Sequence, residues 1–276
     1  MQHVVPQSIP GAGSLRSGSP SSDAEDIRAY YHEIAPFYDA EQADRSDLRF
    51  WRRLAESMPG SDILELGAGS GMVTAQCAPA ARRLLAVDLS PDLLQLARQR
   101  LRSWPQVELA QADMRALDVA DSFDLIVAAN DPISHLTADQ DRDQVLHVVA
   151  NHLAPGGRFV LDALWLPPED ARAVVTAAGR VKAHSLRMDG RTVRVRERWR
   201  RDPGQSRRCS AQYVYSVPGH RSVTAEFQAR DWSLPEVRER FAHAGLRIVS
   251  LWGSYTCDAW HPDRSTRLIV VAGLPS

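Results

Sequence analysis

The segment ELGAGSG, residues 65–71, places one carboxylate and three glycines where an apolar strand predicted at 62–67 ends. Glycines at such a strand-to-helix turn let the backbone approach a ligand closely, and the N–H groups of the following helix point at it. Two further acids, Asp88 and Asp113, end the next two predicted strands. Because the carboxyl ends of parallel strands share one edge of a sheet, we expect the loop and both acids to form one ligand site.

The spacing of the glycines distinguishes two kinds of ligand. A dinucleotide site needs G-x-G-x-x-G so that a pyrophosphate can lie on the helix N-terminus, but Met72 stands where the last glycine would be. The carboxylate of Glu65 would also repel a pyrophosphate, whereas it would attract a sulfonium or ammonium group. These residues therefore disfavour a nicotinamide-dependent oxidoreductase and favour a cationic ligand.

Short apolar strands alternate with helices around this loop. The strands are predicted at 62–67, 84–88, 107–113, 123–130 and 158–164, and the helices between them at 90–101 and 138–153. From Pro167 onwards apolar residues alternate with polar ones, which predicts antiparallel strands, in the runs 193–199, 211–215 and 223–229. The first pattern then resumes with a helix and two strands, at 234–244, 247–252 and 267–273.

These patterns predict an α/β fold, a doubly wound, mostly parallel seven-stranded sheet of the Rossmann-like type with an antiparallel β insert after the fifth strand. The Gly/Ser/Pro-rich residues 1–25 are predicted to form a disordered tail. The core is expected to comprise 26–166 and 233–276, with an aromatic-rich helical lid at 26–55, and the insert to comprise 167–232.

The composition limits the expected location and partners. The 276-residue chain has 33 Lys and Arg against 34 Asp and Glu, a net charge of −1, so it lacks the overall positive field that favours nucleic acid binding. Its three cysteines, Cys77, Cys209 and Cys257, show no metal-ligand spacing and fit a reducing compartment. The sequence shows neither a secretory signal nor an apolar run that could cross a membrane. We therefore expect a cytoplasmic protein without nucleic acid or membrane partners.

In order and spacing, four segments resemble the motifs of class I S-adenosylmethionine-dependent methyltransferases. They are ELGAGSG, AVDLS (86–90), QADM (111–114) and FDLIVAAN (123–130), and LAPGGRFVL (153–161) is similar to the turn before the family's fifth strand. The resemblance extends over roughly 28–274 and implies an enzyme whose methyl donor is S-adenosyl-L-methionine. It does not specify the methyl acceptor.

The resemblance also implies which residues contact the donor: Tyr38, Glu65, Gly67, Ala68, Gly69, Gly71, Asp88, Leu89, Asp113, Met114 and Asn130. Glu65 would face the amino group of the methionine part, and Asp88 would bind the ribose hydroxyls. Asp113 would accept a hydrogen bond from the adenine amino group, with Leu89 and Met114 packed nearby. Leu89 and Met114 fit simple core positions equally well.

The loop AANDPISHL, residues 128–136, resembles the segment that lies beside the methyl group in family members acting on small molecules. The candidates for catalysis are His135 as a base that titrates near neutrality, Asp131 as its orienting group or as a partner for an ammonium, and Tyr38. A histidine that braces the loop and an acid that forms a turn before proline are the structural alternatives. No other ligand-like spacing accompanies Asp131 and Asn130, so no metal is expected.

Aromatic side chains in the lid and the insert supply the expected acceptor contacts. The candidate acceptor-binding residues are Tyr30, Tyr31, Asp131, His135, Trp199 and Tyr213. The resemblance implies that an insert at this position builds either the acceptor pocket or the interface of a homodimer. Its aromatic face fits a simple core of the insert as well, and interface or core is favoured. The expected acceptor is a small, partly apolar molecule of specialised metabolism, methylated at nitrogen first, then oxygen, then an electron-rich carbon such as that of an indole. The alternatives are a donor-binding protein without methyl transfer and an enzyme acting on RNA or protein.

Overall fold

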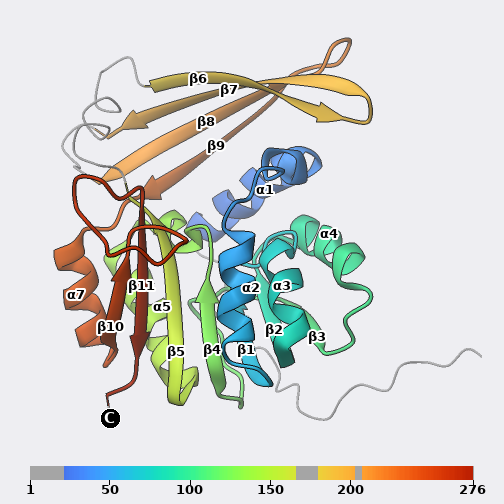
Figure 1. Ribbon diagram of the computed structural model, residues 1–276. Helices are drawn as coiled ribbons and strands as arrows, with labels where there is room; N and C mark the ends of the chain where they lie inside the picture. The colour runs from blue at the N-terminus through green and yellow to red at the C-terminus, as the bar shows by residue number, and fades with distance from the viewer. Residues whose placement is uncertain (1–21, 166–179, 203–206, 276) are drawn as a thin grey trace, which may run out of the picture.

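The computed structural model describes residues 22–165, 180–202 and 207–275 (Figure 1). The predicted tail lies mostly outside these ranges, but residues 22–25 belong to helix α1, Ser22–Glu41. The helix thus begins earlier than the composition indicated. Glu25 and Asp26 lie near its start, where acidic side chains favour a helix by interacting with its dipole.

One seven-stranded sheet forms the centre of the molecule, with the strand order β3-β2-β1-β4-β5-β11-β10. Its strands are β1 Ser61–Leu66, β2 Ala81–Asp88, β3 Val107–Gln111, β4 Phe123–Ala128, β5 Leu153–Leu164, β10 Arg247–Trp252 and β11 Arg267–Gly273. Strand β11 runs antiparallel to both of its neighbours, and the other pairs are parallel. The predicted Rossmann-like, mostly parallel fold is confirmed.

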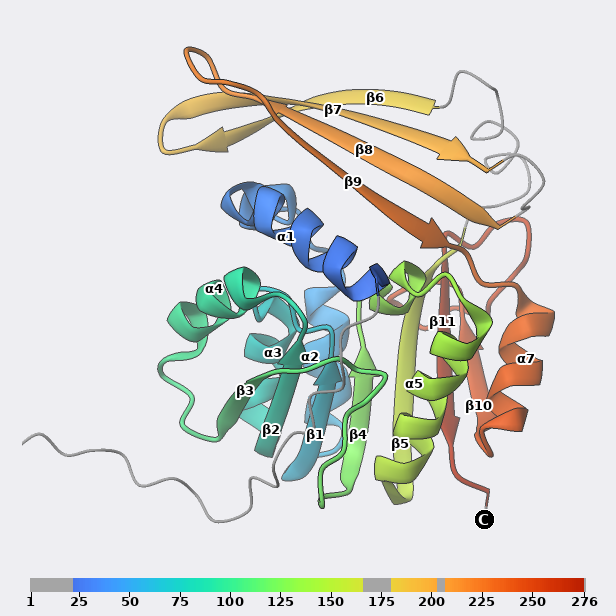
Figure 2. The same ribbon diagram turned by 180° about the vertical axis from the view of Figure 1, so that it is seen from behind.

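Helices cover both faces of this sheet (Figures 1 and 2). The helices of the core are α2 Leu48–Glu56, α3 Met72–Cys77, α4 Pro91–Leu101, α5 Asp139–His152 and α7 Leu234–His243. On β1, Ile63 packs with the residues of α2 and α3, whereas Leu64 and Leu66 pack with those of α5 and α7. This arrangement explains why every residue of β1 is buried, and it holds the loop that follows β1 on a rigid support.

A second, antiparallel sheet lies above the first, in the order β6-β7-β8-β9. Its strands are β6 Arg180–Met188, β7 Arg191–Arg201, β8 Arg208–Ser216 and β9 Val223–Arg230. It confirms the predicted antiparallel insert, but β6 was not foreseen, because its sequence RVKAHSLRM does not alternate cleanly between apolar and polar residues.

Helix α1 lies between the two sheets, above the carboxyl ends of the parallel strands (Figures 1 and 2). Its residues Tyr30, Ile34 and Phe37 form a buried cluster with apolar side chains of the second sheet. The ring of Phe37 stacks on that of Tyr215 with 4.3 Å between centroids. The second sheet thus holds α1 in place over the ligand-binding edge of the first.

Two absences can be stated for the described ranges. None of their helices is long and apolar enough to cross a membrane. They also contain no group of three or more His, Cys, Asp or Glu side chains that could hold a metal ion. The three cysteines are free.

Candidate active site

The glycine loop after β1 can be built only with glycines. Gly67, Gly69 and Gly71 have φ values of 74°, 55° and 78°, which side chains rarely adopt. A Cβ atom at Gly67 would lie 2.5 Å from the Cβ of Pro132, and one at Gly69 would lie 2.8 Å from the hydroxyl of Tyr38. The loop therefore exposes bare backbone to a pocket between the sheet edge and α1, as a close-fitting ligand requires.

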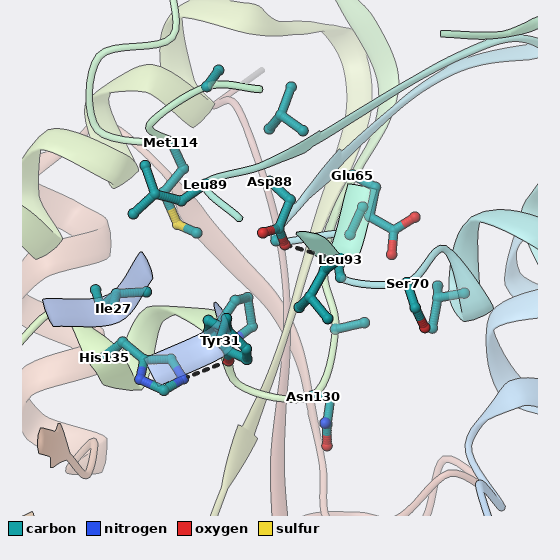
Figure 3. A pocket seen from close by; sticks show the side chains of 18 of the residues that line it. Ile27, Tyr31, Glu65, Ser70, Asp88, Leu89, Leu93, Met114, Asn130 and His135 are labelled. Atoms are coloured by element: carbon teal, nitrogen blue, oxygen red, sulfur yellow. Dashed lines mark hydrogen bonds between the residues drawn. The ribbon is translucent and has the colours of Figure 1, made fainter. Parts of the chain in front are cut away.

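Asp88 connects this loop to the end of β2. Its carboxylate is 9% exposed and accepts hydrogen bonds from the backbone N–H groups of Gly69, at 2.7 Å, and Ser90, at 2.8 Å. Burial raises the pKa of Asp88. The side chain lies in the pocket (Figure 3), where a carboxylate with remaining lone pairs could accept hydrogen bonds from hydroxyl groups of a ligand.

Glu65 supplies a second buried carboxylate to the same pocket. It is 2% exposed and accepts a hydrogen bond of 2.6 Å from the hydroxyl of Thr74. Burial raises the pKa of Glu65 to about 7. The raised pKa shows that the surrounding groups do not fully stabilise the negative charge of Glu65. A cationic ligand beside this carboxylate would therefore bind favourably.

Asp113 lies at the far end of the pocket, near Leu89 and Met114. Its carboxylate accepts hydrogen bonds from the Arg115 side chain, from Nε to Oδ1 at 3.0 Å and to Oδ2 at 3.1 Å, and from Nη2 to Oδ2 at 2.5 Å. Burial acts to raise the pKa of Asp113, but the hydrogen bonds from Arg115 outweigh it and hold the pKa below its ordinary value. Arg115 thus keeps this acid ionised and fixed in orientation.

The sequence analysis missed Arg45, which also lines this pocket. Asp47 holds its guanidinium through two hydrogen bonds, of 2.6 Å from Nε and 2.5 Å from Nη2, and Trp51 donates to the same carboxylate. No motif marks Arg45, because it lies in the connection between α1 and α2. Its position on the side of the pocket lined by Tyr38 became apparent only in the folded chain.

The hydroxyl of Tyr31 lies 2.9 Å from Nε2 of His135, and Figure 3 shows this pair beside the donor-side residues. Burial lowers the pKa of His135 to about 4, so the imidazole is neutral at neutral pH. The expectation that His135 titrates near neutrality was therefore wrong, because the apolar surroundings disfavour the imidazolium ion. Nδ1 of His135 is buried and has no hydrogen-bond partner among the residues that the structure places.

Tyr31 and His135 stand where the first pocket meets a second cavity, since both line each of them. The second cavity comprises about 1090 Å³ including its open mouth. All six predicted acceptor-binding residues line it: Tyr30, Tyr31, Asp131, His135, Trp199 and Tyr213. Further wall residues were not predicted, among them Glu41, Tyr215, Phe227, Asp231 and Arg267.

Asp162 of β5 is fully buried and fixes the loop that carries Asn130 and Asp131 through hydrogen bonds. Oδ2 of Asp162 accepts from the backbone N–H of Asn130 at 3.0 Å, and its backbone oxygen accepts from the N–H of Asp131 at 2.8 Å. Nε of Arg267 donates to the other carboxylate oxygen at 2.7 Å. The sequence did hold a signal that Asp162 has a structural role, because this acid interrupts an otherwise apolar strand.

Arg142 of α5 braces the other end of the loop. Its side chain is fully buried and donates to the backbone oxygen of Leu136 at 2.9 Å, to that of Asp231 at 3.3 Å and to that of Arg230. Its guanidinium also lies 4.2 Å from the ring centroid of Trp232. Arg142 thereby joins the loop after β4 to the chain that leaves β9.

Arg100 of α4 connects helix α1 to the glycine loop through hydrogen bonds. It donates to Asp39 of α1 at 2.6 Å and to the hydroxyl of Ser70 at 2.8 Å. The lid, the glycine loop and the wall of the second cavity thus form one connected site.

Comparisons with known proteins agree with this geometry. Residues 63–157 match the methyltransferase domain family. The chain is 30% identical over 225 residues to dTDP-3-amino-3,4,6-trideoxy-alpha-D-glucopyranose N,N-dimethyltransferase of Streptomyces venezuelae, covering 78% of this chain and 86% of the relative. It is 29% identical over 229 residues to the cypemycin N-terminal methyltransferase of a Streptomyces species, covering 80% and 86%.

Among solved structures, an S-adenosylmethionine-dependent methyltransferase from Clostridium acetobutylicum has the same fold, with a TM-score of 0.73 at 21% identity over 89% of this chain and 99% of that one. Fold, site and relatives together define an enzyme that uses a methyl donor. The chain belongs to the S-adenosylmethionine-dependent methyltransferases, and its cosubstrate is S-adenosyl-L-methionine.

Proposed function

We propose that this methyltransferase acts on a nitrogen atom of a small acceptor bearing an amine, as part of specialised metabolism. The observation that carries the proposal is the Tyr31–His135 pair at the junction of the two cavities, with an imidazole whose pKa is lowered to about 4. An alcohol or a carbon acid must lose a proton during methyl transfer, for which so weak a base is poorly suited. An amine needs only to be uncharged.

The names of four relatives support nitrogen as the methylated atom. One is a peptide N-terminal methyltransferase, and three others are N,N-dimethyltransferases of amino sugars. These four proteins share nitrogen as the atom that receives the methyl group, whereas their acceptors differ in class. The proposal therefore extends to an amine and not to a particular molecule.

When bound, the donor supplies a methyl group made electrophilic by a positively charged sulfur. Glu65 would hold the methionine amino group, Asp88 the ribose and Asp113 the adenine, and Arg45 would suit the donor's carboxylate. Tyr38, whose hydroxyl lies against the glycine loop, would close the methionine end.

Tyr31 and His135 would position the acceptor amine. In either neutral tautomer of His135 the Tyr31 oxygen keeps a free lone pair, which can accept a hydrogen bond from an amine N–H and direct the nitrogen lone pair at the methyl group. Tyr30, Trp199 and Tyr213 would surround the acceptor and exclude water. This proposal assigns the inner face of the insert to an acceptor pocket rather than to a dimer interface.

The test measures formation of S-adenosylhomocysteine with matched pairs of acceptors. Each pair consists of an amino sugar or a short peptide with a free N-terminus and the analogue that carries a hydroxyl group instead of the amine. We expect turnover with amines and none with their hydroxyl analogues. Equal rates for both members of a pair would overturn the assignment to nitrogen, and donor binding without release of product from any amine would favour a binding protein.

A further inference from the structure

The second sheet has an outer face whose charge the proposed reaction does not explain. Strand β7 carries the sequence RVRERWRR at 194–201, in which Arg194, Arg196, Arg198 and Arg200 occupy alternate positions. We name these four residues the arginine stripe. Side chains alternate between the two faces of a strand, so all four lie on one face.

The stripe faces away from the active site. Val193 and Val195, at the intervening positions of the same strand, are 2% and 1% exposed and pack in the cluster with α1, and Trp199 lines the acceptor cavity. The opposite face has no described helix or strand over it in either view of the molecule (Figures 1 and 2).

The neighbouring strands do not neutralise this charge. The outward residues paired with the stripe are all uncharged: Val181, Ala183, Ser185, Ser210, Gln212, Val214 and Ser216. The nearest acid in the outward rows is Glu226, two strands away, which accepts a hydrogen bond from Gln212. Within residues 22–165, 180–202 and 207–275, no carboxylate forms an ion pair with any arginine of the stripe.

Several arginines elsewhere in the chain are paired with carboxylates. Arg115, Arg230 and Arg240 each contact at least one carboxylate at 3.1 Å or less. The Cα atoms at alternate positions of a strand are only about 7 Å apart, so guanidinium groups carried there repel one another. A row of cations without a carboxylate partner among the described residues would be stabilised by an anionic partner.

We propose that the arginine stripe is a docking surface for an acidic protein segment. Carboxylates accept paired hydrogen bonds from the planar guanidinium group, so charge and geometry are complementary. Nucleic acid fits less well, since the described outward positions of this sheet include no aromatic side chain on which a base could stack. A lipid surface fits less well too, because among the residues that the structure describes Val181 is the only exposed large apolar side chain on this face.

This docking surface is independent of the proposed methyl transfer. The stripe and the acceptor wall share strand β7 but use its opposite faces, so the stripe can be altered without touching a side chain that lines either cavity.

The experiment measures binding of a fluorescent deca-glutamate peptide to the full-length protein at low and at physiological salt. The test variant is Arg194→Gln with Arg196→Gln. The control variant is Arg98→Gln on α4 with Arg102→Gln directly after this helix, where both side chains are exposed and the net charge changes equally. We expect the peptide to bind, its affinity to fall by about tenfold in the test variant and to change by less than twofold in the control. Affinity for S-adenosylhomocysteine should stay unchanged in both.

Absence of peptide binding at low salt, or equal loss in both variants, would overturn the proposal. The same measurement with a uridine 20-mer and with phosphatidylserine vesicles tests the identity of the partner. Tighter binding of either one, if it depended on the stripe, would replace the acidic protein segment. Sedimentation of the protein alone tests self-association, and a dimer that the stripe substitutions dissociate would assign the face to a second copy of this chain.

Discussion

The Tyr31 hydroxyl and Nε2 of His135 lie 2.9 Å apart although the two residues are separated by 104 positions in the chain. Tyr31 comes from the lid helix α1, and His135 from the short helix Pro132–His135 that follows β4. Their contact joins the lid to the loop beside the donor pocket. It also places a hydroxyl group and a neutral imidazole between the two cavities, at a boundary that Tyr38 and Asn130 line as well.

Replacing Tyr31 with phenylalanine should separate positioning from packing. The Tyr31→Phe variant keeps the ring contacts with Tyr30 and Tyr38 but loses the hydroxyl, so kcat should fall by roughly 10- to 100-fold while donor affinity stays the same. Steady-state kinetics and calorimetry with S-adenosylhomocysteine measure the two effects. The matched variant Tyr213→Phe, whose hydroxyl contacts Glu197, should lose much less, and an equal loss would contradict the special role of Tyr31.

Donor binding should depend on pH through Glu65. Burial raises its pKa to about 7, and a cationic donor requires the ionised form, so binding releases a proton at lower pH. Affinity for S-adenosylmethionine should therefore increase by about tenfold from pH 6 to pH 8. Calorimetry across this range provides the measurement. A Glu65→Gln variant should bind more weakly and with a flat pH profile; a profile identical to that of the parent enzyme would show that another group titrates.

Folding stability should decrease in acid because of His135. The folded protein keeps this imidazole neutral down to a pKa of about 4, whereas the unfolded chain binds a proton near pH 6.5. The unfolded state is therefore favoured progressively as the pH falls from about 6.5 to 4, by about 2 kcal/mol at pH 5. Urea unfolding at pH 5 and pH 8 measures the difference. It should be smaller in His135→Gln, and an unchanged difference would place the titration elsewhere.

The glycine loop offers a test of close backbone approach. Gly69→Ala would bring a methyl group to 2.8 Å from the Tyr38 hydroxyl at a φ of 55°, and should weaken donor binding by at least about tenfold. Gly60→Ala is the matched control, since its φ is 76° but nothing lies within 4 Å of the added atom. Both variants should lose similar backbone stability, and donor affinity measured by calorimetry should fall only in Gly69→Ala.

Removing the Arg142 guanidinium should loosen the acceptor side of the site. Arg142→Met would leave the buried backbone oxygen of Leu136 without this donor, so the free energy of unfolding should decrease by about 2–4 kcal/mol. The acceptor KM should rise by a larger factor than the donor Kd. Arg142 holds the backbone of Asp231, which lines the second cavity, and touches the first pocket only through Leu136. Arg98→Gln, on an exposed position, should change neither quantity. A stability change below about 0.5 kcal/mol would show that other contacts hold the loop.

Most residues of the pocket proposed for the methyl donor could be predicted from the sequence, because short sequence patterns mark them. The strand-to-helix turn at 65–71 needs its glycines, and the acids Asp88 and Asp113 follow strands whose apolar runs are recognisable by themselves. Parallel strands then bring their carboxyl ends together in any protein of this architecture. All the predicted donor residues except Gly71 line the pocket at that edge of the sheet, with Tyr38 reaching it from α1. Gly71 packs against Ala97 and Leu101 of α4 instead. The strand boundaries differ from the prediction by only a few residues.

The acceptor half depends on contacts between distant segments. Nothing near His135 in the sequence reveals that burial lowers its pKa, that Tyr31 approaches it from the lid, or that Arg45 enters the donor pocket. The braces Asp162 and Arg142 were missed for the same reason, whereas strand β6 was missed because its sequence does not alternate cleanly between apolar and polar residues. The amino-acid sequence alone thus determined the class of fold and the cradle for the methyl donor, since both follow from short-range backbone preferences. Only the tertiary structure decided the acceptor cavity, because its walls, electrostatics and proton affinities arise when the insert packs across α1 onto the sheet edge and excludes water.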